Sequence, residues 1–312
     1  MKILIVDDLH PVLTNVLSHH GFICKYAPNM TYTEILNEIQ EYEGIVMRSH
    51  TPINKEILNK AEKLKFIAKA GSGIDNIDEE ECKKRNIIII NAPEGNRDAV
   101  AEFTVGVLLS LARNICTANN QVKQFEWKRE ENRGFELKGK TIGIIGYGNI
   151  GYALSQRLHG FQMRVLAYDK YKSHFSNLFA QEATLEQLYE EADIVTFHVP
   201  LTQETHHWVN LKWLMKFKKS IVLLNMARGK IVVLEDILKG LENGKISALG
   251  LDVLPNENFD TYSEEEKEVL QKISRFSNVI LTPHVAGWTY TSKVQLSEVL
   301  AYKILKINNL KK

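Results

Sequence analysis

Short apolar runs alternate with amphipathic segments along the whole chain, a pattern typical of parallel β-sheets whose strands are joined by helices. In the first part of the chain, strands are expected at residues 2–7, 44–47, 66–70 and 87–91, with helices between them, for example at 33–41 and 55–63. One long helix is expected from residue 99 to about 122, because apolar residues recur there at helical spacing.

A second series of strands begins at residue 141. Six apolar runs, with helical patterns between them, are expected to form a further parallel sheet: 141–146, 163–168, 193–198, 220–225, 247–252 and 278–281. A last helix is expected at about 289–310. Six strands with interleaved helices are the arrangement of a dinucleotide-binding sheet.

Length, charge and cysteine content narrow the class of protein. A chain of 312 residues suggests two domains, and 39 basic against 38 acidic residues give no reason to expect nucleic acid or a membrane surface as a partner. Cys24, Cys82 and Cys116 show neither metal-ligand spacing nor a disulfide framework, so we expect no metal site and a reducing, cytoplasmic location. The sequence predicts no signal peptide and no transmembrane helix.

The first chemical signal is a Gly-x-Gly-x-x-Gly motif that follows an apolar strand and opens a helix. Gly146 permits a tight turn, Gly148 lets the backbone approach a pyrophosphate, and Gly151 lets the helix pack on the strand. Asp169 ends the next strand, where a carboxylate binds the adenosine ribose and repels a 2′-phosphate. NAD is therefore the expected cofactor; Lys170 follows directly and weakens that repulsion, which leaves NADP open.

Three further motifs follow at residues 225–229, 250–257 and 281–287. Together with the glycine motif they resemble the D-2-hydroxyacid dehydrogenase family, and the resemblance runs from Ile45 to about Gly287. It implies a catalytic trio of arginine, glutamate and histidine, which in this chain are Arg228, Glu257 and His284.

The chemistry of a 2-oxo acid calls for these residue types. The fork of Arg228 would bind the carboxylate and polarise the carbonyl oxygen. His284 would give or take the proton near neutral pH, and Glu257 would hold its ring in one tautomer.

The same resemblance implies an α/β fold of two Rossmann-like domains with parallel sheets. A flavodoxin-like substrate domain is expected from residues 1–97 and 287–312, and the NAD-binding domain from residues 98–286. Cofactor and substrate would bind in the cleft between them. A homodimer is also implied, with residues 99–140 as the arm that joins the subunits.

Several further cofactor contacts are implied by the resemblance. Asp252 matches a residue that contacts the nicotinamide carboxamide, Thr104 matches one that faces the cofactor, and His198 forms a wall of the adenine side. The remaining expected contacts are Asn149, Ile150, Pro200, Thr205, Met226 and Ala227.

The segments at residues 47–51 and 69–78 resemble those of 3-phosphoglycerate dehydrogenases. Arg48 and Lys69 would supply cations for a phosphate, and the backbone N–H groups of Ser72 and Gly73 would cradle the substrate carboxylate. The other expected substrate contacts are Ser49, Asn96 and Arg228.

The expected function is therefore NAD-dependent oxidation of 3-phosphoglycerate to 3-phosphohydroxypyruvate, the first step of serine synthesis, in a short form without a C-terminal regulatory domain. Two alternatives stay open. Glyoxylate and hydroxypyruvate reductases use the same trio, and non-catalytic, NAD-sensing corepressors that share this fold often keep it.

Overall fold

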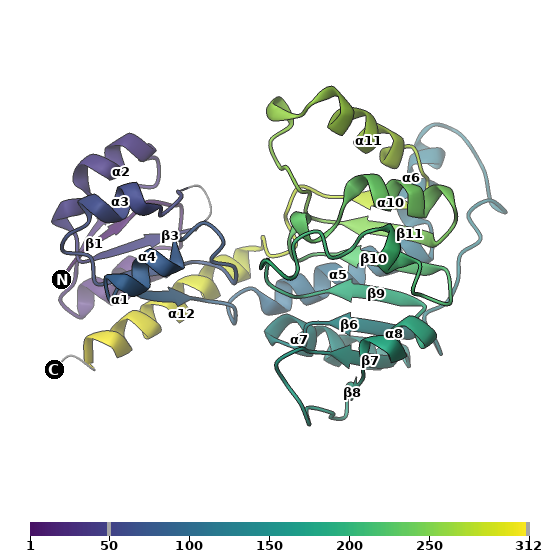
Figure 1. Ribbon diagram of the computed structural model, residues 1–312, viewed down its shortest axis with the longest axis horizontal. Coiled ribbons are helices and arrows are strands. Elements are labelled where there is room, and N and C mark those ends of the chain that lie inside the picture. The colour runs from purple at the N-terminus through teal and green to yellow at the C-terminus, as the bar shows by residue number, and fades with distance from the viewer. Residues whose placement is uncertain (49–50, 310–312) are drawn as a thin grey trace. The chain divides into compact units, whose positions relative to one another are not determined.

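Two parallel sheets organise the chain, and each belongs to its own compact unit (Figure 1). The structure is a computed structural model that describes residues 1–48 and 51–309. Unit 1 is Met1–Arg97 together with the C-terminal segment that begins at Trp288, and unit 2 is Asp98–Gly287. The predicted α/β class with two parallel sheets is confirmed.

Unit 1 holds five parallel strands in the order β2-β1-β3-β4-β5, the order of a flavodoxin-like sheet. Its strands are β1 (Lys2–Ile5), β2 (Ile23–Tyr26), β3 (Gly44–Met47), β4 (Phe66–Lys69) and β5 (Ile88–Asn91). Its helices are α1 (Val12–His19), α2 (Tyr32–Glu38), η1 (Ile39–Glu41), α3 (Lys55–Lys60), α4 (Glu79–Lys84) and α12 (Tyr290–Asn309). Helices α1 and α12 bury apolar side chains on one face of this sheet, and α2, α3 and α4 do so on the other.

Unit 2 holds seven strands in the order β12-β11-β10-β9-β6-β7-β8. Its strands are β6 (Thr141–Ile145), β7 (Arg164–Tyr168), β8 (Gln181–Glu182), β9 (Ile194–Phe197), β10 (Ile221–Asn225), β11 (Ile246–Leu251) and β12 (Val279–Leu281). Its larger helices are α5 (Arg97–Ala112), α6 (Ile115–Lys123), α7 (Asn149–Leu158), α8 (Leu185–Glu191), α10 (Leu234–Glu242) and α11 (Glu264–Ser274). Its shorter ones are η2 (His159–Phe161), α9 (Leu211–Leu214), η3 (Gly229–Ile231) and η4 (Phe259–Thr261).

The faces of the second sheet are covered by different helices. Helices α5 and α7 pack on one face, and α8, α9, α10 and α11 pack on the other. The strand order reverses between β6 and β9. In open α/β sheets the connections that follow two such strands run to opposite faces of the sheet, and a crevice forms between them at the carboxyl ends of the strands. Ligands of open α/β sheets bind at such points.

The prediction of one long helix at residues 99–122 is wrong. Asn114 adopts a left-handed conformation with φ of 51°, which ends α5, and α6 continues at a bend of 63°. Helix α5 buries seven of its 16 residues, whereas α6 buries none of its residues. Among the described residues, no single helix has the length and apolarity to cross a membrane, and the bent pair α5–α6 meets those limits only when taken together.

Strands β2 and β8 were not predicted, and no bounds were predicted for helices α1 and α4. Strand β2 lies at an edge of its sheet and leaves Ile23 and Tyr26 exposed, so it lacks a buried apolar run. Helix α4 buries only Cys82 among six residues, which leaves no apolar periodicity to detect.

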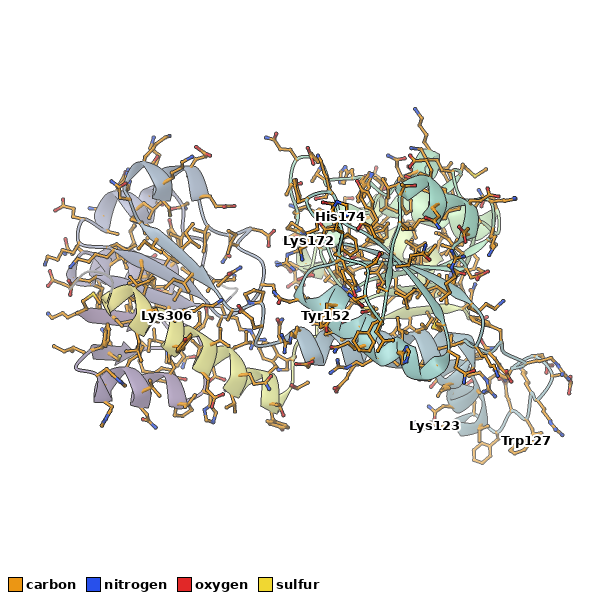
Figure 2. The ribbon with its side chains drawn as sticks, turned by 90° about the horizontal axis from the view of Figure 1, so that it is seen from below. Lys123, Trp127, Tyr152, Lys172, His174 and Lys306 are labelled. Atoms are coloured by element: carbon orange, nitrogen blue, oxygen red, sulfur yellow. The ribbon has the colours of Figure 1, made fainter. Side chains whose placement is uncertain are left out.

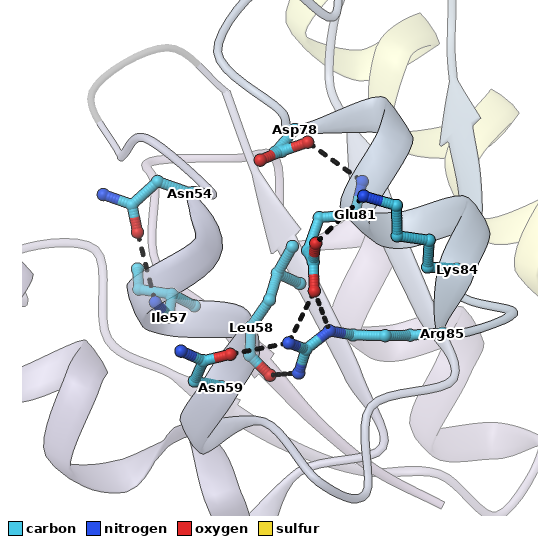
Figure 3. Close-up of polar contacts among 8 residues, drawn as sticks. All are labelled: Asn54, Ile57, Leu58, Asn59, Asp78, Glu81, Lys84 and Arg85. Atoms are coloured by element: carbon cyan, nitrogen blue, oxygen red, sulfur yellow. Dashed lines mark hydrogen bonds and ion pairs between the residues drawn. The ribbon is translucent and has the colours of Figure 1, made fainter.

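Polar contacts join α3 and α4 in unit 1 (Figure 3). The Arg85 guanidinium donates to Glu81 Oε1 on its own helix, and to the Leu58 carbonyl and Asn59 Oδ1 of α3. Asp78 caps α4 by accepting a hydrogen bond from the backbone N–H of Glu81. These contacts anchor the far end of the loop that follows β4, which carries several of the predicted substrate residues.

Candidate functional site

The glycine turn lies between β6 and α7, at the point where the strand order reverses. Gly146 has φ of +97°, and a Cβ there would lie 2.6 Å from the carbonyl oxygen of His198. A Cβ on Gly151 would lie 2.3 Å from the carbonyl oxygen of Gly146. At Gly148 a Cβ would meet no atom within 4 Å, so the space above this residue, at the N-terminus of α7, is open to a phosphate. Asn149 and Ile150 begin the helix at the same place.

Asp169 follows β7 and is bonded to the glycine turn. Its Oδ2 accepts from the backbone N–H of Tyr147 at 2.9 Å, and its Oδ1 accepts from that of Tyr171 at 3.0 Å. Lys172 Nζ donates to the Tyr147 carbonyl at 2.7 Å, so the loop after β7 holds the turn from both sides; Lys172 is labelled in Figure 2. A carboxylate has about four acceptor positions, and the two left on Asp169 can accept from ribose hydroxyls.

The segment after β9 carries three of the predicted cofactor contacts. His198 Nε2 lies 3.1 Å from Thr196 Oγ1, whereas its Nδ1 is buried and has no hydrogen-bond partner in the part of the chain that the structure describes. Burial lowers the pKa of His198 to about 3, so the ring is neutral. Thr205 Oγ1 donates to the Pro200 carbonyl at 2.8 Å, which fixes the turn of this loop.

The three predicted catalytic residues come from three loops of unit 2. Arg228 precedes η3, after β10, and its Nη1 donates to the Ala227 carbonyl at 2.7 Å. Gly229 packs against the next loop so closely that a Cβ would lie 2.0 Å from the backbone of Leu254. This contact joins the loop of Arg228 to the loop that carries Glu257.

Glu257 and His284 form an ion pair or hydrogen bond in unit 2. Glu257 Oε2 lies 3.0 Å from His284 Nδ1, and both side chains are about half exposed, at 47% and 48%. Burial raises the pKa of Glu257, but the hydrogen bond and charge of His284, with a further contribution from Arg228, outweigh it, and the pKa is lowered. Glu257 is therefore a carboxylate at neutral pH and accepts the proton of Nδ1, which leaves Nε2 to exchange a proton with a substrate.

Asp252 positions the loop that carries His284. Its carboxylate is buried and accepts from Thr282 Oγ1 at 2.6 Å and from the backbone N–H groups of Val285 and Ala286 at 3.0 and 2.8 Å. Its backbone carbonyl also accepts from the His284 N–H at 2.8 Å. Three side-chain bonds leave about one acceptor position of the carboxylate for a cofactor amide.

Thr104, Met226 and Ala227 are buried in unit 2. The Thr104 hydroxyl donates to the Val100 carbonyl at 2.7 Å within α5, so only its lone pairs remain for a ligand. Asn225, which the sequence did not single out, shapes the loop of Arg228: its amide donates to the Arg228 carbonyl and accepts from the Ala227 N–H.

The comparisons with known proteins decide the family. The model of the D-isomer specific 2-hydroxyacid dehydrogenase NAD binding domain matches residues 105–286, more than half of the chain. The chain belongs to the D-isomer specific 2-hydroxyacid dehydrogenase family. The predicted family and the prediction of NAD as the cofactor are confirmed by this match.

The proteins to which this chain is similar are named for different activities. The D-3-phosphoglycerate dehydrogenase of Methanocaldococcus jannaschii is 35% identical over 310 residues, which are 98% of this chain and 57% of that protein. The chain thus spans little more than half the length of this relative. The hydroxypyruvate reductase of Thermotoga maritima is 33% identical, with 96% of both chains covered. The D-lactate dehydrogenase of Aquifex aeolicus, solved with NAD and lactic acid, superposes with a TM-score of 0.85 at 27% identity and covers 100% of this chain and 97% of its own.

Apart from Arg228, the described residues that the sequence predicted to bind the substrate lie in unit 1. Ser72 Oγ donates to Asn96 Oδ1 at 3.2 Å, and Asn91 Nδ2 donates to the Ser72 carbonyl at 2.7 Å. The backbone N–H groups of Ser72 and Gly73 have no acceptor among the residues that the structure describes. Two such neighbouring donors can together bind an anion. Lys69 is buried and donates to Asn76 Oδ1 at 2.7 Å. Ser49 lies outside the described residues.

Arg48 borders a cavity of about 410 Å³ in unit 1. Its guanidinium stacks on the Trp288 ring, 3.8 Å from the centroid, and donates no hydrogen bond to any described residue. Burial lowers the pKa of Arg48, and the charges of Asp7 and Asp8 oppose that shift. The other residues that line the cavity are Asp8, Thr289, Tyr290 and Lys293, and an ion pair of 2.6 Å joins Asp8 to Lys293. The sequence did not indicate that Trp288 lines this cavity, because Trp288 lies just beyond the histidine motif and belongs to none of the motifs.

Proposed function

We propose that the chain is an NAD-dependent D-2-hydroxyacid dehydrogenase that interconverts 3-phosphoglycerate and 3-phosphohydroxypyruvate. The observation that carries the enzyme class is the 3.0 Å contact between Glu257 and His284, with the Arg228 loop packed beside it through Gly229. This arrangement lies at the carboxyl ends of strands in the NAD-binding domain of the family.

NAD, when bound, would supply the acceptor for the hydride that leaves C2 of the hydroxy acid, and the residues of the chain would manage the proton and the charge. In the oxidation, His284 Nε2 takes the proton of the 2-hydroxyl while the C2–H bond breaks, and a C2=O double bond forms. Glu257 stabilises the resulting imidazolium through Nδ1–H. Arg228 binds the carboxylate of the substrate and polarises the carbonyl oxygen; the reduction runs through the same steps reversed.

Arg48 supports a substrate with a second anionic group. A partly buried guanidinium with free donors beside a cavity is suited to bind a phosphate or carboxylate through two parallel hydrogen bonds. The backbone cradle of Ser72 and Gly73 supplies donors for the other anion of the same substrate.

Reduction of hydroxypyruvate or glyoxylate is the second candidate. Two observations favour it: the Thermotoga hydroxypyruvate reductase is matched over 96% of both chains, and the charge around Arg48 is already balanced. Arg48 and Lys293 carry two positive charges, and Asp7 and Asp8 carry two negative ones, so a dianion gains less attraction here than beside two free cations.

Purified protein should be assayed for NADH oxidation at saturating cofactor with 3-phosphohydroxypyruvate, hydroxypyruvate and glyoxylate. We expect the highest kcat/KM with the phosphorylated acid and a selective loss of that preference in Arg48→Gln. A higher kcat/KM with an unphosphorylated acid would assign the reductase function. Binding of NADH without turnover of any of the three would favour a non-catalytic NAD sensor.

We also propose that the protein is a cytoplasmic homodimer joined through the region that follows α5. Phe125 and Trp127 are 100% and 84% exposed, and Ile115 and Val122 of α6 are more than half exposed. Figure 2 shows Lys123 and Trp127 on a projecting end of unit 2. Light scattering should give twice the mass of the chain, and Phe125→Asp with Trp127→Asp should give the monomer mass.

A further inference from the structure

An ion pair joins two loops at the carboxyl edge of the second sheet. Lys170 follows β7, Glu204 lies in the loop after β9, and Lys170 Nζ is 2.5 Å from Glu204 Oε2. The sheet order β9-β6-β7 places their strands on either side of β6. The pair therefore spans the end of the strand that leads into the glycine turn.

The two sides of this pair are held in place. On one side, Asp169, the neighbour of Lys170, is bonded to the glycine turn through the Tyr147 N–H. On the other, Thr202 and Thr205 exchange backbone-to-hydroxyl hydrogen bonds of 2.8 and 3.3 Å, and Glu204 lies between them in the chain. The backbone that carries Glu204 is thus held by this turn.

The charge beside the 2′ position of the adenosine ribose determines whether NAD or NADP binds more tightly. The carboxylate of Asp169 suits the 2′-hydroxyl of NAD, whereas a nearby cation accommodates the 2′-phosphate of NADP. Lys170 is adjacent to Asp169 and would be that cation, but its ammonium is bound to Glu204. With Glu204 present the three side chains carry a net charge of −1, and without it they are neutral.

We propose that Glu204 is a specificity-determining residue that sets the preference of this chain for NAD over NADP by holding Lys170 and adding a negative charge beside Asp169. The proposal rests on the ribose role of Asp169 given above. Glu204 acts on the coenzyme through Lys170 and through its own charge, and it takes no part in the proton transfer at His284.

The test is the binding of NADH and NADPH, measured by titration calorimetry without substrate, for the wild type and for Glu204→Gln. We expect the ratio of the NADPH Kd to the NADH Kd to fall about two- to fivefold, the range that an exposed ion pair commonly supplies. Most of the change should come from tighter NADPH binding, and it should shrink as salt screens the charges. In a Lys170→Gln background, Glu204→Gln should shift the ratio less.

Glu190→Gln is the matched control, because Glu190 also forms an exposed pair with a lysine, Lys218. This pair lies at the amino ends of the parallel strands β9 and β10, whereas the glycine turn follows the carboxyl end of β6. It should leave the ratio unchanged. An unchanged ratio in Glu204→Gln, in a protein that binds NADH normally, would overturn this proposal and leave the proposed function standing. A wild type that binds neither coenzyme would overturn both.

Discussion

His198, a half-buried residue, is the ionisable group whose effect on stability can be worked out most directly. The ring is held neutral, because its Nδ1 is buried without a partner in the described part of the chain and its pKa is about 3. In the unfolded chain a histidine has a pKa of about 6.5. As the pH falls below 6.5 the unfolded chain takes up a proton that the folded chain does not, so His198 destabilises the fold progressively until the pH reaches its native pKa.

The magnitude follows from the two pKa values. Between about pH 7 and pH 5, linkage gives a loss of roughly 2 kcal/mol in the free energy of unfolding from this one group. His198→Gln keeps a polar end that can reach Thr196 and removes the titration.

The assay is urea unfolding of the wild type and of His198→Gln at the two pH values, without NAD. Tryptophan fluorescence follows unit 2, which holds three of the four tryptophans, Trp127, Trp208 and Trp213. All other residues are the same in both proteins, so the difference between the two pH-induced losses isolates His198. If the variant loses as much stability as the wild type between pH 7 and pH 5, the reasoning is wrong.

Three further predictions test the loops of the site. Gly229→Ala should destabilise the protein by about 1–3 kcal/mol and lower kcat, because its Cβ has to displace the Leu254 backbone. Gly106→Ala, at an exposed position of α5 where a Cβ would meet nothing within 4 Å, should be neutral or slightly stabilising in the same urea titration. His284→Ala should abolish turnover and leave the NADH Kd nearly unchanged; turnover at the wild-type rate would refute its acid–base role. Asp252→Asn should lower the urea midpoint by an amount equal to about 1–3 kcal/mol, because the new amide turns a donor towards N–H groups of the His284 loop, and an unchanged midpoint would show that those bonds are dispensable.

The sequence predicted best those elements whose signal is local. Strand β6 and its glycine turn combine a buried β-branched run with glycines at fixed spacing, so their place was clear. The break between α5 and α6 depends on one residue, Asn114, whose left-handed conformation no apolar periodicity reveals. Edge strand β2 was missed because its side chains are exposed.

The contacts between loops that are distant in the sequence could not be predicted at the site. The types of Arg228, Glu257 and His284 were predicted from motifs, but the packing of Gly229 on Leu254 depends on strand β10 lying next to β11. The pairing of Lys170 with Glu204 likewise depends on the order β9-β6-β7, which no local pattern contains.

The backbone of His284 explains why Asp252 is buried beside it. His284 has φ of 55°, a left-handed conformation that costs a residue with a side chain about 1–2 kcal/mol. Such strain persists only where the surroundings over-determine it, and here the Asp252 carbonyl binds the His284 N–H while its carboxylate binds three donors of the same loop. In the proposed mechanism His284 presents one nitrogen to Glu257 and the other to the substrate, and a relaxed backbone would turn the ring away from one of them. On that proposal, the hydrogen bonds of Asp252 hold the acid–base histidine in its working orientation.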